Sequence, residues 1–358
     1  MKKIAILMSL VVSLTMFSGC GETKTKLKYD TLENVRNSID SALSKEYNHI
    51  TINKNITVDI PDTVNVYDTS YISLIKDKDD PKIKDLLGIL YDSDDFDKGK
   101  NIGDEIFESF LEEDTENAVY QYFNKTKDEN AAIGKDGYLH LGPDELLNTH
   151  VIECSYADRI KDNEVYKKVR SAADSKLEQA VSLQDNYNME PYLFYKVESE
   201  QGNSFYKIYY CRTFDGLLNM PFGADNITNI DISESGSVQN RWIMDEVSVW
   251  VDENFSVRAM HIQNLWKARK NEALEKIPTL DSVLNYISKE IAPNYNVNVS
   301  NIKLMYAHDI TDNKIYPVWY VEFSNNSNDI EYSNRIIVNS STGLISSYIE
   351  GSYAEHQG

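Results

Sequence analysis

Hydrophobic positions in the first half of this chain follow the spacing of a helix and then of strands. Residues 31–47 place apolar side chains on one face of a helix, and Asp30 or Thr31 precedes them as a cap. Those apolar positions are Leu32, Val35, Ile39 and Leu43. Further predicted elements are strands at 50–52 and 56–60 and one or two helices within 103–125. The pattern predicts an N-terminal α+β region over residues 30–150.

The second half repeats one order of elements. A helical pattern over 164–184 precedes three strand-like runs, and a second helical pattern over 281–291, capped near Thr279, precedes three more. The strand-like runs are 192–197, 204–213 and 246–260, then 302–308, 316–324 and 335–348. The last hairpins of the two sets also share their turn chemistry, although turn chemistry alone restricts composition in this way. The order predicts two tandem units, each a helix with an antiparallel sheet, over 151–268 and 269–358.

Residues 1–19 have the pattern of a secretory signal peptide. Two lysines precede an apolar run that is shorter than the ~20 residues a membrane-spanning helix needs. Ser18, Gly19 and Cys20 then resemble the lipobox of bacterial lipoproteins, in which the cysteine is acylated, for example with palmitate. The alternative is an ordinary signal peptide with Cys20 as an incidental thiol. The resemblance implies a lipid-anchored protein on the extracytoplasmic face of the cell membrane, with residues 20–29 as lipidated cysteine and polar tether.

The net charge limits the kinds of partner that the chain can bind, and the cysteines bear on whether a disulfide forms. The formal net charge is −21, which argues against nucleic acid because phosphates would repel such a chain. If Cys20 carries lipid, Cys154 and Cys211 remain, and both lie in strand-like runs. An exported protein meets oxidising conditions, so either a Cys154–Cys211 disulfide or two buried thiols is expected.

Recognisable catalytic and metal-binding motifs are missing from the sequence. It has no nucleophile elbow, P-loop, dinucleotide fingerprint or zinc-protease motif, and its six histidines are scattered singly. The acidic stretch 92–97 suggests a calcium loop but departs from the EF-hand pattern, because Phe96 takes the fifth position and no glycine takes the sixth. We therefore expect no cofactor, no metal and no enzymatic activity, with a hydrolase of unrecognised site as an alternative.

The last part of the chain resembles a known family. The runs 302–306, 316–321 and 337–345 are similar to the PepSY-type unit and to the modules of the YycH and YycI regulators of Gram-positive bacteria, as well as to uncharacterised clostridial lipoproteins. The motif residues are Pro317, Trp319 and Gly343. Trp319 is expected to pack between helix and sheet, and Gly343 to take a positive φ in a turn.

The resemblance implies that the protein modulates another cell-envelope protein by binding it. We therefore predict a membrane-anchored extracytoplasmic lipoprotein that acts as a binding or regulatory module. A glycan- or peptide-binding surface lipoprotein is the main alternative, and it predicts a cleft lined by exposed tryptophans.

Overall fold

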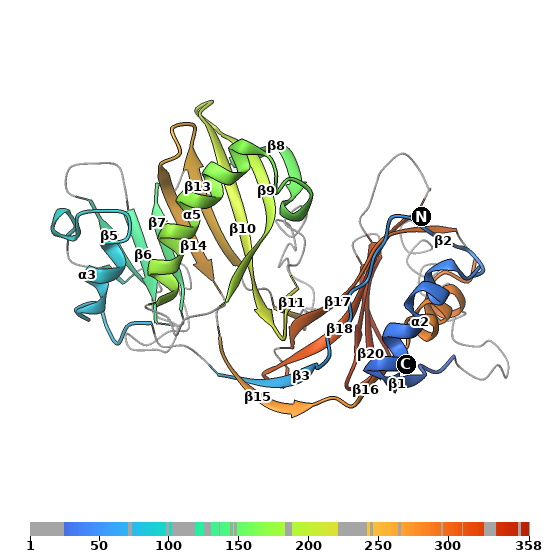
Figure 1. Cartoon of the computed structure of the whole chain (residues 1–358). Helices are drawn as coiled ribbons and strands as arrows, with labels where there is room; N and C mark the ends of the chain where they lie inside the picture. Colours follow the sequence, from blue (N-terminus) through green and yellow to red (C-terminus); the bar gives the residue numbers. More distant parts are fainter. Residues whose placement is uncertain are drawn as a thin grey trace, which may run out of the picture.

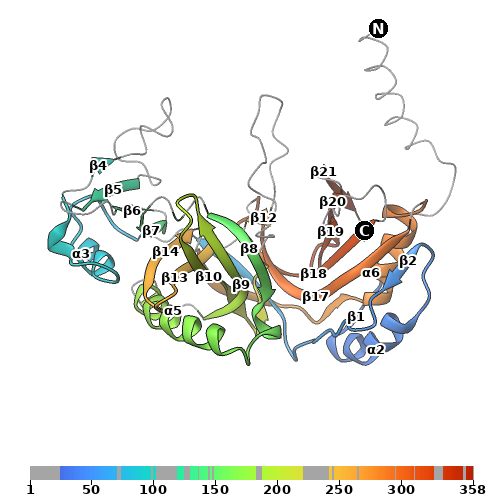
Figure 2. The ribbon, with the colours of Figure 1, turned by 90° about the horizontal axis from the view of Figure 1, so that it is seen from above.

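Two large, mostly antiparallel sheets stand side by side, each with helices packed on one face (Figure 1). In the view from above, α5 (Glu164–Ser182) of one sheet and α2 (Leu32–Ser44) of the other lie on the same side of the molecule (Figure 2). The computed structural model describes residues 25–70, 74–97, 100–101, 119–124, 130–135, 137–143, 146, 149–182, 188–220, 242–243, 246–263, 266–294, 296–309, 311–325, 334–349 and 352–357.

The first sheet has ten strands in the order β4-β5-β6-β7-β14-β13-β10-β9-β8, with β11 paired to β10. Its strands are β4 (Lys100–Asn101), β5 (Val119–Phe123), β6 (Asn130–Gly134), β7 (Leu139–Gly142), β8 (Thr149–Tyr156), β9 (Met189–Ser199), β10 (Ser204–Phe214), β11 (Leu217–Leu218), β13 (Glu246–Asp252) and β14 (Val257–Gln263). Helices α5 and α3 (Lys82–Leu87) share a core with one face of this sheet, and Ala157 of the short helix η3 (Ala157–Arg159) belongs to the same core. The short helix η1 (Ser93–Asp95) has no buried residue.

The second sheet has nine strands and takes members from both ends of the chain. They are β2 (Ile50–Ile52), β3 (Asn65–Ser70), β12 (Trp242–Ile243), β15 (Lys267–Ala273), β17 (Val297–Asp309), β18 (Lys314–Asn325), β19 (Asn334–Asn339), β20 (Leu344–Ile349) and β21 (Ser352–Gln357). Its core packs against α2 and α6 (Leu280–Tyr286), which continues as a π-helix over Ile287–Ile291. A small sheet of β1 (Tyr29–Thr31) and β16 (Lys276–Pro278) lies beside these helices.

The helices with clear local signals form where the sequence predicts them. Thr31 caps α2 by accepting a hydrogen bond from the Asn34 amide at 3.3 Å, and the apolar face of α2 is buried. Helix α5 matches the prediction over 164–184. Thr279 caps α6 by accepting from the Ser282 amide at 3.3 Å. Caps and helical periodicity are local properties, so they can be found without knowing the rest of the fold.

The predicted fold class, α+β with two tandem PepSY-like units, is wrong because the protein is mostly β. A helix does precede antiparallel strands twice, but those strands belong to sheets of ten and nine strands that recruit other segments. The expected region 30–150 contributes β2 and β3 to the second sheet and β4 to β7 to the first.

Two predicted elements of the first half also differ from the structure. Residues 56–60 form no strand, and 119–123, expected to be helical, form β5. In the run Val-Tyr-Gln-Tyr-Phe the β-branched and aromatic residues favour a strand, and Tyr120 and Tyr122 alternate into the core. Residues 103–118 of the predicted helical stretch lie outside the described residues.

A partly buried carboxylate joins the two sheets. Asp215 lies in the turn between β10 and β11 with a φ of 49°, where that hairpin reaches the second sheet. Its carboxylate accepts hydrogen bonds from Asn65 Nδ2 at 2.7 Å, Tyr67 Oη at 3.0 Å and Tyr306 Oη at 2.5 Å. Burial and then the Asp215 contact raise the pKa of Tyr67, and burial raises that of Tyr306 too, so both phenols stay protonated as donors.

Further contacts extend this junction on either side of Asp215. Arg212 donates to the Trp266 carbonyl at 2.5 Å, and His308 Nε2 lies 3.0 Å from Thr69 Oγ1. Burial, and then nearby Arg212, lower the pKa of His308 to about 3, so this imidazole is neutral. Buried polar groups that are paired in this way hold one arrangement of the sheets, since any other would leave them without partners.

We expect Asp215→Ala to destabilise the fold by roughly 3 kcal/mol or more, because three donors lose a charged acceptor inside the junction. Thermal unfolding followed by circular dichroism measures the effect. Asp62→Ala is the control, since Asp62 is 93% exposed and pairs with Arg36 at the surface. Equal melting temperatures for the two variants would contradict the role assigned to Asp215.

Candidate functional site

Strand β8 forms the outer edge of the first sheet and is exposed along most of its length. It pairs with β9 on one side, and residues 150–154 are all exposed. Val151 and Ile152 are 50% and 46% exposed, which makes them the two most exposed large hydrophobic residues among those the structure describes. An unpaired edge presents main-chain N–H and C=O groups to any chain that can pair with it.

A β-bulge shapes this edge. The register of β8 against β9 shifts between Val151 and Glu153, so Ile152 is an extra residue in the ladder. A bulge bends and twists its strand, which limits how far a second strand can follow the edge. The exposed charges of Glu153, and of His150 when protonated, have the same effect on pairing with a flat apolar strand.

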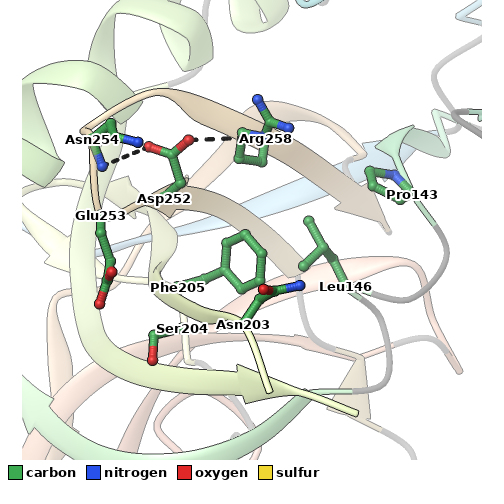
Figure 3. A pocket seen from close by; sticks show the side chains of 9 residues that line it. All are labelled: Pro143, Leu146, Asn203, Ser204, Phe205, Asp252, Glu253, Asn254 and Arg258. Atoms are coloured by element: carbon green, nitrogen blue, oxygen red, sulfur yellow. Dashed lines mark hydrogen bonds and ion pairs between the residues drawn. The ribbon is translucent and has the colours of Figure 1, made fainter. Parts of the chain in front are cut away.

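A pocket of about 480 Å³ lies at the tips of the β9–β10 and β13–β14 hairpins (Figure 3). Its polar residues are Asn203, Ser204, Asp252, Glu253, Asn254 and Arg258, and its apolar residues are Pro143, Leu146 and Phe205. The β13–β14 turn is fixed by Asp252, whose Oδ1 accepts from the amides of Asn254 and Ser256, both at 2.9 Å. The other carboxylate oxygen lies 3.9 Å from Arg258 Nε.

Close contact between β7 and β14 supports one wall of this pocket. Gly142 ends β7 with a φ of 135°, and a Cβ added there would lie 2.4 Å from the Cβ of Ala259. Only glycine fits both the backbone angle and the separation of the strands. The following residue, Pro143, and the buried Leu146 line the pocket.

The residues singled out in the sequence are distributed over the molecule. Cys20 lies outside the described residues. Cys154 is exposed on β8 and Cys211 is buried on β10, and both are thiols rather than halves of a disulfide. Strand β9 runs between these two strands, so the cysteines are too far apart to bond.

The motif residues of the last strands serve the core. Trp319 is fully buried in the cluster that joins β18 to α2 and α6, and it donates from Nε1 to the Pro278 carbonyl at 2.8 Å. Pro317 lies in the same strand and accepts through its carbonyl from the Ser340 amide at 2.9 Å. Gly343 has a φ of 73° in the turn before β20, and a Cβ there would meet Tyr29 Oη at 2.8 Å.

Several features that would mark other functions take structural roles. All four tryptophans, Trp242, Trp250, Trp266 and Trp319, are buried, so the exposed stacking face expected of a glycan-binding protein is not built from them. Asp92 of the acidic stretch caps η1 through the Asp94 amide. Within the described residues, no cluster of three or more potential ligands could hold a metal ion. No described helix is both long and apolar enough to span a bilayer.

Sequence reasoning missed both the edge and the pocket. The sequence pattern of β8 is typical of a strand. Whether a strand is central or at the edge of a sheet depends on its pairing with distant segments. Turn chemistry did predict the last hairpin of the first set, whose turn lies within residues 251–257. Nothing in the local sequence connects Arg258 with Asn203 and Leu146.

Comparisons with known proteins support the fold alone. The chain matches no protein-family model and no curated protein. It is similar to an uncharacterised protein from Eubacterium rectale ATCC 33656, known from a crystal structure, with a TM-score of 0.58 and 16% identity. The match covers 88% of this chain and 98% of that chain, so most of the two-sheet architecture is shared.

We expect Gly142→Ala to destabilise the protein by about 3 kcal/mol or more, through both the clash with Ala259 and the unfavourable φ. Thermal unfolding measures the loss. Adding Ala259→Gly removes the nearest atom but leaves the backbone penalty, so the double variant should recover only part of the stability. Full recovery would contradict the contribution of the backbone angle.

Proposed function

We propose that this protein is an exported, lipid-anchored binding protein that holds an extended segment of another cell-envelope protein against β8. The observation that carries the proposal is an eight-residue edge strand with two adjacent, half-exposed aliphatic side chains, Val151 and Ile152. The proposal assigns no catalytic step to the chain.

Strand addition explains why such an edge would remain exposed. A docked segment gains main-chain hydrogen bonds from β8, and its side chains cover Val151 and Ile152. The bulge and the polar residues His150 and Glu153 keep the paired stretch short. A short pairing favours reversible binding of a partner over permanent sheet-to-sheet aggregation.

The first residues that the structure describes support a short connection to the membrane. The Thr25 amide donates to Glu290 Oε1 at 3.0 Å, and the Lys28 carbonyl accepts from the Thr279 amide at 2.8 Å. Residues 25–28 are therefore bound to the second sheet and its helices, and only 21–24 connect them to Cys20. Fully extended, that connection reaches at most about 17 Å. An acylated Cys20 would thus hold the second sheet near the bilayer.

We expect a photo-reactive amino acid at position 152 to crosslink this protein to one other envelope protein in intact cells. The matched control places the same group at Val165 on α5, which is 37% exposed but belongs to a helix. Adding Val151→Lys should reduce the product at position 152 several-fold, because a charge replaces apolar surface in the contact. Gel mobility and mass spectrometry identify the products.

The crosslinking results separate the alternatives. Equal products from positions 152 and 165 would mean non-specific encounter, and no product at 152 would count against docking on β8. A product that contains two copies of this chain would assign β8 to self-association instead.

The anchor has its own test. We expect cells supplied with labelled palmitate to label the wild-type chain and Cys154→Ala, but not Cys20→Ala, because acylation requires the thiol of Cys20. Immunoprecipitation followed by detection of the label measures this. An unlabelled wild-type chain would remove the lipid anchor from the proposal.

A further inference from the structure

The hairpin-tip pocket combines charges of both signs with an apolar floor. Glu253 of the β13–β14 turn and Arg258 of β14 point in different directions, and the Phe205 ring lies between the two hairpins (Figure 3). Leu146 and Pro143 complete the floor. Its volume of about 480 Å³ falls within the range of roughly 300–1,000 Å³ found for small-molecule sites.

Asp252 orients the Arg258 side chain but does not use all of its hydrogen-bond donors. Its side chain is 53% exposed, and within the described residues its one ion pair is with Asp252, through Nε at 3.9 Å. Asp252 is itself held by two turn amides, so it orients the guanidinium from a fixed position. The two Nη groups remain for a ligand, and a guanidinium fork matches a carboxylate.

The neighbouring carboxylates restrict the kind of anion. Asp252 and Glu253 would repel a doubly charged phosphate, whereas a carboxylate on a ligand that also carries an ammonium group meets opposite charges at both ends. Glu253 is exposed and supplies the acceptor for the ammonium group. The amides of Asn203 and Asn254 on the rim can donate to and accept from peptide bonds.

We propose that this pocket binds a short free peptide as a zwitterion. Its C-terminal carboxylate pairs with Arg258, its N-terminal ammonium group pairs with Glu253, and its side chains lie over Phe205 and Leu146. A neutral glycan would offer no charged partner to Glu253 or to the Nη groups of Arg258. The proposal is independent of docking on β8, because the two sites use different residues.

Calorimetry with three probes tests it on the full-length chain in detergent: trialanine, its C-terminal amide and its N-acetyl derivative. We expect the wild type to bind trialanine, and the amide and the N-acetyl form to bind about tenfold more weakly or less. Arg258→Gln should weaken trialanine binding by a similar factor and abolish the difference between acid and amide. Glu253→Gln should abolish the difference between trialanine and its N-acetyl form.

Two variants serve as matched controls. Arg269→Gln on β15 and Glu200→Gln at the β9–β10 turn remove exposed charges of the same kind, and both should bind trialanine as the wild type does. Melting temperatures establish that each variant is folded. Absence of trialanine binding to the wild type, equal affinity for acid and amide, or unchanged binding by Arg258→Gln would each overturn the proposal.

Discussion

The hydrogen bonds of one carboxylate, Asp215, fix how the two sheets meet. The β10–β11 hairpin belongs to the first sheet, yet its turn contacts β3 and β17 of the second. The chain then continues along β17, where the Met220 amide donates to the Tyr306 carbonyl at 2.5 Å. A partly buried carboxylate needs hydrogen-bond donors to offset the hydration that it loses, and Tyr67, Tyr306 and Asn65 supply them in this arrangement. The sheets are therefore held in one relative position instead of hinging about a linker.

This junction also determines which part of β8 stays exposed. The last residue of β8, Tyr156, meets the second sheet, where Lys303 Nζ lies 5.6 Å from its ring centre and 5.2 Å from that of Tyr192. Burial lowers the pKa of Lys303, but the aromatic faces favour its charged form. One end of β8 is thus held between the sheets while residues 150–154 face outward. A docking edge on a rigid support loses less conformational entropy on binding than a mobile strand would.

The sequence contained enough to locate the helices but not the sheets. Thr31 and Thr279 act within one turn of the chain, so α2 and α6 could be predicted from a cap and a periodicity. Whether a segment joins a sheet depends on partners elsewhere in the chain. The residues of β5 have helical spacing, yet they pair with β6. Strand β2 pairs in parallel with β17, which lies near the other end of the chain. The same dependence explains Cys154 and Cys211, whose strands are separated by β9. The pocket could not be predicted for the same reason, since its residues come from two hairpins and from the segment that follows β7.

If Cys20 carries lipid as proposed, the position of that anchor relative to β8 bears on how the protein would act. Thr25 and Lys28 are bound to Glu290 and Thr279, in the helical segment that packs on the second sheet, whereas the exposed edge belongs to the first sheet. A lipid anchor sits in one leaflet and cannot carry a conformational signal across the bilayer. If β8 holds a partner, any inward signal must therefore pass through that partner, which would have to span the membrane itself. Because Asp215 and its donors fix the two sheets, the chain would restrain the bound segment at a set distance from the bilayer.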